Sequence, residues 1–375
     1  MSTISTIRDE QDTTLRGMTE ALIHRMSPAS TLTDNGRRFR SMTLMEMARE
    51  VLWLNGVATR GMDRMQLAST ALNYRSGAGM STVSDFPSLM SNVANKRLRL
   101  AYTENPGTYR LWARRAEDAK NFKPISAVKV GAMPDLLQVK EHGEFQYGSV
   151  SDGAETYSLL TYGRMIALTR QAMVNDDLRA FDVAVSAFGA AAARLENRTV
   201  YAQLTGNAAL SDGVSLFHAD HSNLATGAGS ALQLSALSAG RTAMRLQKGA
   251  QAEELNITPS FLIVPAALEQ TAYQFTSANY VPALPGSVNE FRSGGRAALT
   301  PVVEPVLDGS SSTAWYLASN SSQIDTVEYC YLEGADGPVI ESHMGISVDG
   351  MTLKCRLDFA AKSIDYRGLY KAEGV

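Results

Sequence analysis

The stretch Asn175–Asn207, NDDLRAFDVAVSAFGAAAARLENRTVYAQLTGN, carries the clearest secondary-structure signal of the chain. Its first three residues offer an N-cap and place negative charge at the positive end of a helix dipole, and its closing Gly-Asn is typical of a helix end. The pattern predicts a helix over residues 178–205, roughly 40 Å long at 1.5 Å per residue. Its narrow, alanine-rich stripe favours one-sided packing against a sheet or helix, whereas a coiled coil would need more heptads. The stripe comprises Phe181, Val185, Phe188, Ala192, Leu195, Thr199 and Ala202.

Two extended runs before this helix predict a long hairpin arm over residues 132–168. The apolar and aromatic residues of the first run lie between positions 136 and 147, and those of the second between 156 and 168. The intervening sequence GSVSDG is a turn signal. Because neither run has a thick apolar face, and an isolated hairpin is marginally stable in water, the arm is expected to lie on another surface. Such an arm is typical of a subunit that assembles with its copies.

The region before residue 80 is expected to form an N-terminal extension. Residues 1–40 are polar and mixed in charge, and we expect them to be mobile or ordered only by neighbours. Further on, Thr43 with Glu46 and Asp63 with Gln66 form capping-box signals that predict two short helices. The small-residue stretch RSGAGMSTVS then predicts a linker and a domain boundary.

The rest of the chain mixes helices with short strands and predicts an α+β fold class. Helices are expected over residues 85–100 and 235–246. Turn signals such as DGSSST and GADG separate two of the predicted strand pairs. The expected strands are 257–264, 301–307, 314–319, 326–332, 339–343 and 351–357.

Composition places the chain among globular proteins with a substantial core. Its 375 residues are 45% hydrophobic and 19% charged, and a net charge of −3 gives no global excess of positive charge that would indicate nucleic-acid binding. The two cysteines, Cys330 and Cys355, are expected to be reduced. The first residues lack the pattern of a secretory signal, and no run of about 18 apolar residues exists, so we expect no membrane segment.

Residues 96–123 form the most basic window of the chain, with eight basic against three acidic residues. One interpretation is an ordinary solvated face whose long side chains cover apolar surface. The other is a surface turned toward nucleic acid, because lysine and arginine neutralise phosphate charge. The basic residues are Lys96, Arg97, Arg99, Arg110, Arg114, Arg115, Lys120 and Lys123.

The sequence offers one motif that resembles a metal site. His218, Asp220 and His221 lie within the sequence HADH, and histidine with aspartate can ligate zinc in hydrolases. The other histidines form no supporting pair, so a polar turn explains the motif better and a zinc hydrolase remains only an alternative. No nucleophile elbow, paired catalytic cysteine or nucleotide-binding loop is present. We therefore expect neither enzymatic activity nor a cofactor.

Several long stretches in order resemble a known family, the major head subunits of Mu-like tailed bacteriophages, and specifically the capsid half of prohead protease–capsid fusion proteins. The resemblance covers about residues 80–375. It is carried by SDFPSLMSNVANKRLRLAY (84–102), WARRAEDAKNFKPIS (112–126), EHGEFQYGSVSDGAETYSLLTYGRMIALTRQAMVNDDL (141–178), FGAAAARLEN (188–197), DGVSLFHADHSNLA (212–225) and DFAAKSIDYRGLYKAEG (358–374).

The resemblance implies the Hong Kong 97-type capsid fold, in which an N-terminal arm, an extended E-loop, a P domain with a spine helix and a central A domain follow one another. The extension resembles the segment between protease and shell domain, so it would serve either as an ordered arm that wraps neighbours or as a scaffold-like or delta-like region that is cut away on maturation. The implied boundaries are 1–80 for the extension, 81–131 for the N-arm and start of the P domain, 132–168 for the E-loop, 169–259 for the P domain with spine helix 178–205, 260–345 for the A domain and 346–375 for the return strand and tail.

The same resemblance implies a major capsid protein that forms pentamers and hexamers of an icosahedral head around double-stranded DNA. It would be found in the virion, and in the host cytoplasm during assembly. Implied partners are other copies, the DNA, a portal, a prohead protease, a scaffold and decoration proteins. An encapsulin-like nanocompartment shell is the alternative. The expected intersubunit residues are Glu144, Tyr147, Ser151, Asp152 and Glu155, and the candidate DNA-facing residues are Lys96, Arg97, Arg99, Arg114 and Arg115.

Overall fold

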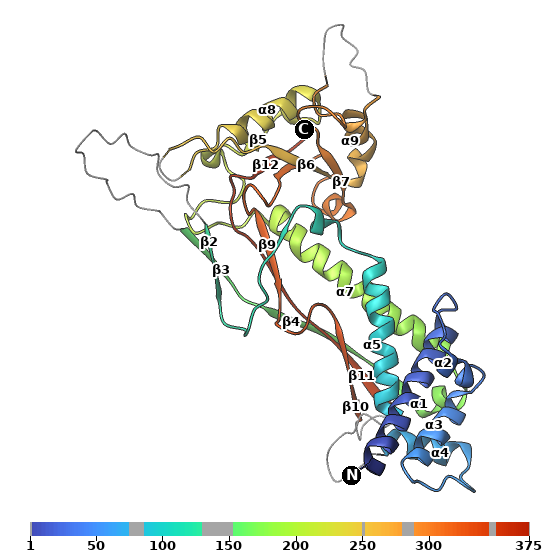
Figure 1. Cartoon of the computed structure of the whole chain (residues 1–375). Coiled ribbons are helices and arrows are strands. Elements are labelled where there is room, and N and C mark those ends of the chain that lie inside the picture. Colours follow the sequence, from blue (N-terminus) through green and yellow to red (C-terminus); the bar gives the residue numbers. More distant parts are fainter. Residues whose placement is uncertain are drawn as a thin grey trace. The chain divides into compact units, whose positions relative to one another are not determined.

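The computed structural model describes residues 2–74, 86–129, 153–249, 252–279, 289–344 and 350–374 (Figure 1). The chain forms two compact units. The first unit consists of Met1–Pro106, Thr161–Ala193 and Ala335–Asp358, and the second of Gly107–Leu160, Arg194–Gly334 and Phe359–Val375. Both helices and sheets are present, which confirms the predicted α+β class.

The part of the first unit before residue 75 is helical. Both predicted capping boxes are present, with Thr43 and Asp63 accepting from the backbone of the third helical residue and receiving the reciprocal bond. Of the two states expected for residues 1–40, mobile or ordered only by neighbours, the described part shows the second, because Met18 and Leu22 are completely buried on one side of a long helix. Dense polar residues on its other face had obscured that stripe. The helices are α1 (Ser2–Met26), α2 (Asp34–Phe39), α3 (Leu44–Leu54) and α4 (Arg64–Asn73).

The first unit combines these helices with further helices and with part of a sheet. Strand β10 pairs antiparallel with β11, from Val339 opposite Arg356 to Met344 opposite Met351, and β4 pairs with β11 as well. One continuous core joins the N-terminal helices to the later elements, so the boundary expected near residue 80 does not separate two cores. The added elements are α5 (Phe86–Glu104), α6 (Arg170–Val174), α7 (Leu178–Gly206, through residue 193), β4 (Leu160–Thr169), β10 (Val339–Met344) and β11 (Gly350–Ser363, through residue 358).

The second unit is built on a sheet with the strand order β5-β12-β8-β6-β7. Strand β6 runs parallel to β7 and antiparallel to β8, and helices α8 and α9 pack beside this sheet (Figure 1). The elements are β5 (Leu224–Ala225), α8 (Leu234–Arg245), β6 (Pro259–Val264), α9 (Glu269–Thr276), β7 (Thr300–Val303), β8 (Trp315–Ser319) and β12 (Leu369–Ala372).

Two further strand groups belong to the second unit. Strand β9 pairs parallel with β1 and antiparallel with the second half of β11, while β2 pairs antiparallel with β3. Short 3-10 helices complete the unit. These elements are η1 (Thr108–Leu111), β1 (Arg114–Arg115), β2 (Ile125–Lys129), β3 (Gly153–Tyr157), η2 (Ala219–His221), η3 (Ala228–Ser230), η4 (Ala266–Leu268), η5 (Pro305–Gly309) and β9 (Val327–Tyr331).

The strand pairing crosses two of the predicted segments. Strands β9 and β10 were expected within the 260–345 domain, yet both pair with β11, and β12 of the tail joins the sheet of β6 instead. The predicted hairpin strand at 156–168 is split, because β3 pairs with β2 while β4 pairs with β11. Sequence periodicity identifies a strand but does not say which strand it pairs with, since the pairing depends on residues distant in the chain.

Helix α7 confirms the predicted helix over 178–205 and ends one residue later. Asp177 supplies the cap, since its carboxylate accepts from the Ala180 amide at 3.1 Å. The predicted stripe fits the first half of the helix but not the second, where Leu195, Thr199 and Ala202 give way to other buried positions. A strict seven-residue repeat drifts by about 20° per heptad around a 3.6-residue helix, which explains the error. The buried residues there are Glu196, Val200, Tyr201 and Leu204.

The two cysteines lie in the sheet strands of the second half of the chain. Cys330 on β9 and Cys355 on β11 are buried free thiols, and burial raises the pKa of each to about 11. Across the described ranges, no helix is both long and apolar enough to span a bilayer.

Candidate functional sites

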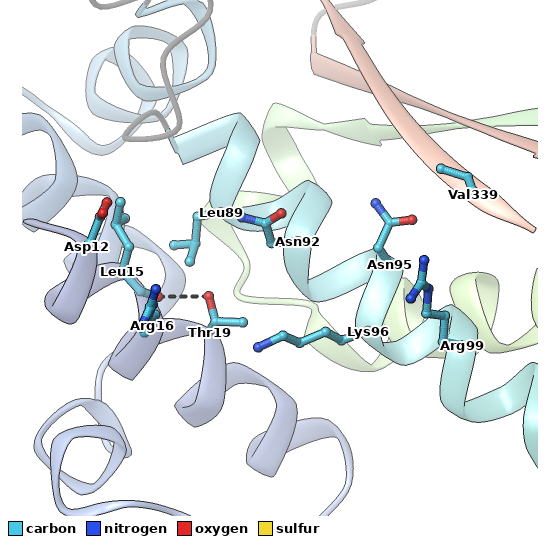
Figure 2. A pocket seen from close by; sticks show the side chains of 10 residues that line it. All are labelled: Asp12, Leu15, Arg16, Thr19, Leu89, Asn92, Asn95, Lys96, Arg99 and Val339. Atoms are coloured by element: carbon cyan, nitrogen blue, oxygen red, sulfur yellow. Dashed lines mark hydrogen bonds between the residues drawn. The ribbon is translucent and has the colours of Figure 1, made fainter. Parts of the chain in front are cut away.

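A groove of about 500 Å³ lies between α1 and α5 of the first unit, with Val339 of β10 at one side (Figure 2). Its floor includes the buried side chains of Leu15 and Leu89. Three exposed cations line it, namely Arg16, Lys96 and Arg99. The groove therefore combines an apolar floor with a mainly cationic rim, to which Asp12 contributes one negative charge. Such a surface suits an anionic partner.

The groove divides the five candidate DNA-facing residues into two groups. Lys96 and Arg99 line it and form no ion pair within the described residues. The other three form ion pairs within the chain, so their charges are already partly neutralised. Arg97 pairs with Asp182, Arg114 with Asp325 and Arg115 with Asp118.

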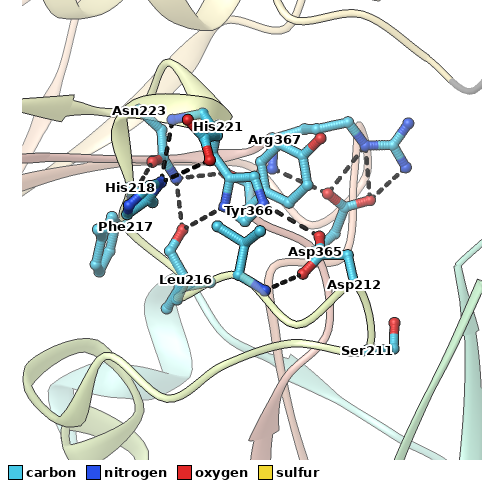
Figure 3. Close-up of polar contacts among 12 residues, drawn as sticks. Ser211, Asp212, Leu216, Phe217, His218, His221, Asn223, Asp365, Tyr366 and Arg367 are labelled. Carbon is cyan, nitrogen blue, oxygen red and sulfur yellow. Dashed lines mark hydrogen bonds and ion pairs between the residues drawn. The ribbon is translucent and has the colours of Figure 1, made fainter.

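The HADH residues do not converge on a shared point (Figure 3). His218 is exposed, and its Nδ1 accepts from the Asp220 amide at 3.2 Å. His221 is buried and stacks on Tyr366, with ring centroids 3.6 Å apart and an interplanar angle of 4°. Its Nε2 lies 3.1 Å from the carboxylate of Asp212. Among the described residues no three potential metal ligands gather, so the motif lacks the geometry of a zinc centre.

His221 belongs instead to a polar cluster that joins the 211–223 loop to the C-terminal segment (Figure 3). Asn223 donates to the carbonyl of Leu216 at 2.8 Å and to that of Tyr366 at 3.4 Å. Beside it, the Arg367 guanidinium Nε lies 3.0 Å from both carboxylate oxygens of Asp365. No sequence pattern indicated this cluster, since its two halves are more than 140 residues apart. The arrangement therefore holds the two segments together and has a structural role.

The sequence did not predict that two carboxylates of the second unit, Glu196 and Glu304, are buried. Glu196 of α7 accepts from the Tyr109 hydroxyl at 2.8 Å and from the Arg110 guanidinium at 3.3 Å. Glu304 accepts from the side-chain amide of Asn197 at 2.8 Å and from Thr108. Burial and the neighbouring Glu196 charge raise the pKa of Tyr109 far above its ordinary value. These bonds fix η1 against α7, so each carboxylate has a structural role.

Replacing Tyr109 by phenylalanine is expected to lower the free energy of unfolding by about 1–3 kcal/mol, because the buried Glu196 carboxylate loses a hydroxyl donor. Urea denaturation measures the change. The matched control is Tyr273→Phe, since Tyr273 is 48% exposed and should change stability by less than about 0.5 kcal/mol. Equal losses in the two variants would contradict the role given to the buried bond.

The predicted intersubunit residues fall mostly outside the described residues, namely Glu144, Tyr147, Ser151 and Asp152. Glu155 is described and does not face outward. Its side chain is buried in its own subunit and accepts from the Ser211 amide at 2.7 Å. Glu155 therefore offers no surface to a neighbour, which corrects its assignment.

Comparison with known families decides the identity. The model of the family described as phage capsid protein matches residues 153–372, more than half of the chain. The chain belongs to the phage capsid protein family. This finding confirms the predicted resemblance, and it makes the protein a structural component of a phage virion that assembles with copies of itself. It does not favour the nanocompartment alternative.

Solved structures similar to this capsid protein share little sequence with it. A chain of Mycobacterium phage Adephagia is 11% identical, with 72% of this chain and 88% of that chain covered and a TM-score of 0.45. A procapsid chain of bacteriophage JBD30 is 13% identical, with 76% and 75% covered and a TM-score of 0.41. A virus-like particle from Pyrococcus furiosus is 11% identical, with 75% and 98% covered and a TM-score of 0.43. No curated protein sequence matches, so the assignment rests on the family model.

Proposed function

We propose that this protein is a major capsid protein whose copies form pentamers and hexamers of an icosahedral head around double-stranded DNA. The family match over residues 153–372 is the observation that carries the proposal. Contacts between identical subunits in a ring are heterologous, so closure depends on the rotation between neighbours. The capsid protein would meet a portal, a prohead protease, a scaffold and decoration proteins, first in the host cytoplasm and then in the virion.

The proposed organisation is of the Hong Kong 97 type, with boundaries adjusted to the strand pairing. Helix α7 serves as the spine of the P domain. The sheet β5-β12-β8-β6-β7, with α8 and α9, corresponds to the A domain. The antiparallel pair β2–β3 forms the base of the E-loop, and the rest of the predicted loop between these strands lies outside the described residues.

Cryo-electron microscopy of nuclease-treated particles purified from an infected lysate tests both parts of this function. The proposal expects rings of five and six subunits in one closed shell that protects double-stranded DNA. Open tubes built from one ring type, or closed shells that hold only protein, would overturn it.

Shortening the E-loop is expected to abolish shell formation and leave the subunit folded, because the loop packs on neighbouring subunits. Residues 132–150 are replaced by a short Gly-Ser linker, which spares Gly153–Tyr157 and the buried Glu155. Sedimentation and circular dichroism measure assembly and fold. Normal shells from this variant would refute the role of the loop.

Lys96 and Arg99 are the proposed phosphate-facing residues, because both are exposed and unpaired within the described residues. Replacing both by glutamine should reduce the slope of log affinity against log salt by about 0.9 for each phosphate that is no longer neutralised. Titration of the purified subunit with a generic DNA duplex measures that slope. The matched control is Lys120→Gln with Lys123→Gln, two exposed lysines outside the groove. The same slope in both double variants would argue against DNA binding by Lys96 and Arg99 in the groove.

A further inference from the structure

The N-terminal helices are built into the core of the first unit. Among the described residues, thirty buried apolar residues form this core, and sixteen of them lie between Leu15 and Leu72. The remaining fourteen come from α5, α6, α7, β10 and β11. More than half of this core would therefore disappear with residues 2–74. A segment that is cut away after assembly is expected to lie outside the core it leaves behind, since the retained part must stay folded.

A polar clamp ties the same helices to the start of α7. Asp176 adopts a left-handed conformation with φ of 54°, which is uncommon for a residue other than glycine. Its carboxylate accepts from the Leu44 amide at 2.9 Å and from the Arg25 guanidinium at 2.5 Å. Arg25 in turn donates to the carbonyl of Met42 at 2.9 Å. Leu44, Arg25 and Met42 all belong to the N-terminal segment, so its removal would leave Asp176 strained and without these bonds.

The N-terminal helices also cover apolar side chains of the later elements. Helices α3 and α4 pack against α6, and α1 packs against α5. Met173 of α6, Val185 of α7 and Leu353 of β11 belong to the core that these helices complete. Their exposure would create a contiguous apolar patch of the kind that leads to aggregation.

We infer that residues 2–74 are a permanent part of the shell subunit and are retained in the mature head. The inference rests on the proposed capsid function and decides between the two roles expected for the extension. Any scaffold used in assembly would then come from another segment or another protein.

Tryptic peptide mapping of mature, DNA-filled heads tests the inference directly. Peptides 41–49 and 50–60 report on α3, and peptide 171–179 is an internal reference from the retained shell domain. Retention predicts equal molar amounts of all three. Heads that contain peptide 171–179 without the other two would overturn the inference while leaving the capsid function intact.

If no shells form, the unfolding of the purified chain in solution tests the inference independently of the capsid function. A chain lacking residues 2–74 is expected to aggregate or to lose cooperative unfolding, whereas a monomeric truncation that unfolds like the full chain would refute the inference.

Arg25→Gln should accelerate amide hydrogen exchange in α3 by about tenfold, as expected for the loss of a charge-assisted hydrogen bond. The control is Arg37→Gln, because the Arg37 guanidinium pairs with Asp34 at an exposed position, with side chains 69% and 97% exposed. Equal exchange rates in the two variants would also count against the clamp.

Discussion

Replacing Asp182 by alanine is expected to lower the free energy of unfolding by about 3–5 kcal/mol, because it leaves the Arg97 guanidinium as an unpaired charge in a largely buried position. The Arg97 Nε lies 2.5 Å from the Asp182 carboxylate, and the two side chains are only 15% and 17% exposed. The pair joins α5 to the first half of α7 within the first unit. Urea denaturation followed by circular dichroism measures the loss.

The control for this prediction is Asp118→Ala, which breaks the pair of Asp118 with Arg115. That pair is much more exposed, and such pairs contribute about 0–1 kcal/mol. A similar loss of unfolding free energy in the two variants would show that burial does not determine how much the Arg97–Asp182 pair contributes to stability.

Replacing Gly189 by valine is expected to prevent the close approach of α5 and α7 and to lower the free energy of unfolding by about 3 kcal/mol or more. A Cβ atom at this position would lie 2.7 Å from the Leu98 carbonyl oxygen and 2.9 Å from the Tyr102 amide nitrogen. Both are backbone atoms, so no side-chain rotation relieves the clash. Gly189→Ala should show a smaller loss of about 1–3 kcal/mol. Thermal unfolding and shell yield are measured together.

Gly206 provides the matched control, since it lies on the same helix and an added Cβ would meet no atom within 4 Å. Gly206→Ala should leave stability unchanged or increase it, because alanine loses less conformational freedom in a helix than glycine. A Gly189→Ala variant as stable as Gly206→Ala would contradict the close packing of the two helices.

Local signals in the sequence predicted much of the secondary structure. The capping boxes at Thr43 and Asp63 and the long helix α7 depend on residues within a few positions of one another, and the structure confirms each. The strand β6 was also predicted, with a start two residues too early. Such features follow from backbone propensity and capping, so a single sequence contains the information needed.

Features that depend on distant parts of the chain could not be predicted in the same way. The apolar residues of α1 are scattered among polar ones in the sequence. That they form one buried face can be recognised only from the packing of α3 and α5 against this helix. Glu196 and Glu304 resembled ordinary surface carboxylates, although hydrogen bonds from Tyr109 and Asn197 allow their burial. Three of the five candidate DNA-facing residues are engaged in ion pairs, and two of their acidic partners lie far outside the basic window. The family resemblance, which summarises such long-range information, was the signal that led to the function.

Sedimentation of the purified chain, combined with negative-stain microscopy of the same sample, tests the central claim most directly. The account predicts closed shells of uniform diameter that form from this subunit, alone or with a scaffold protein added. A subunit that remains a monomer or dimer across salt and protein concentrations, with the scaffold present, would contradict it.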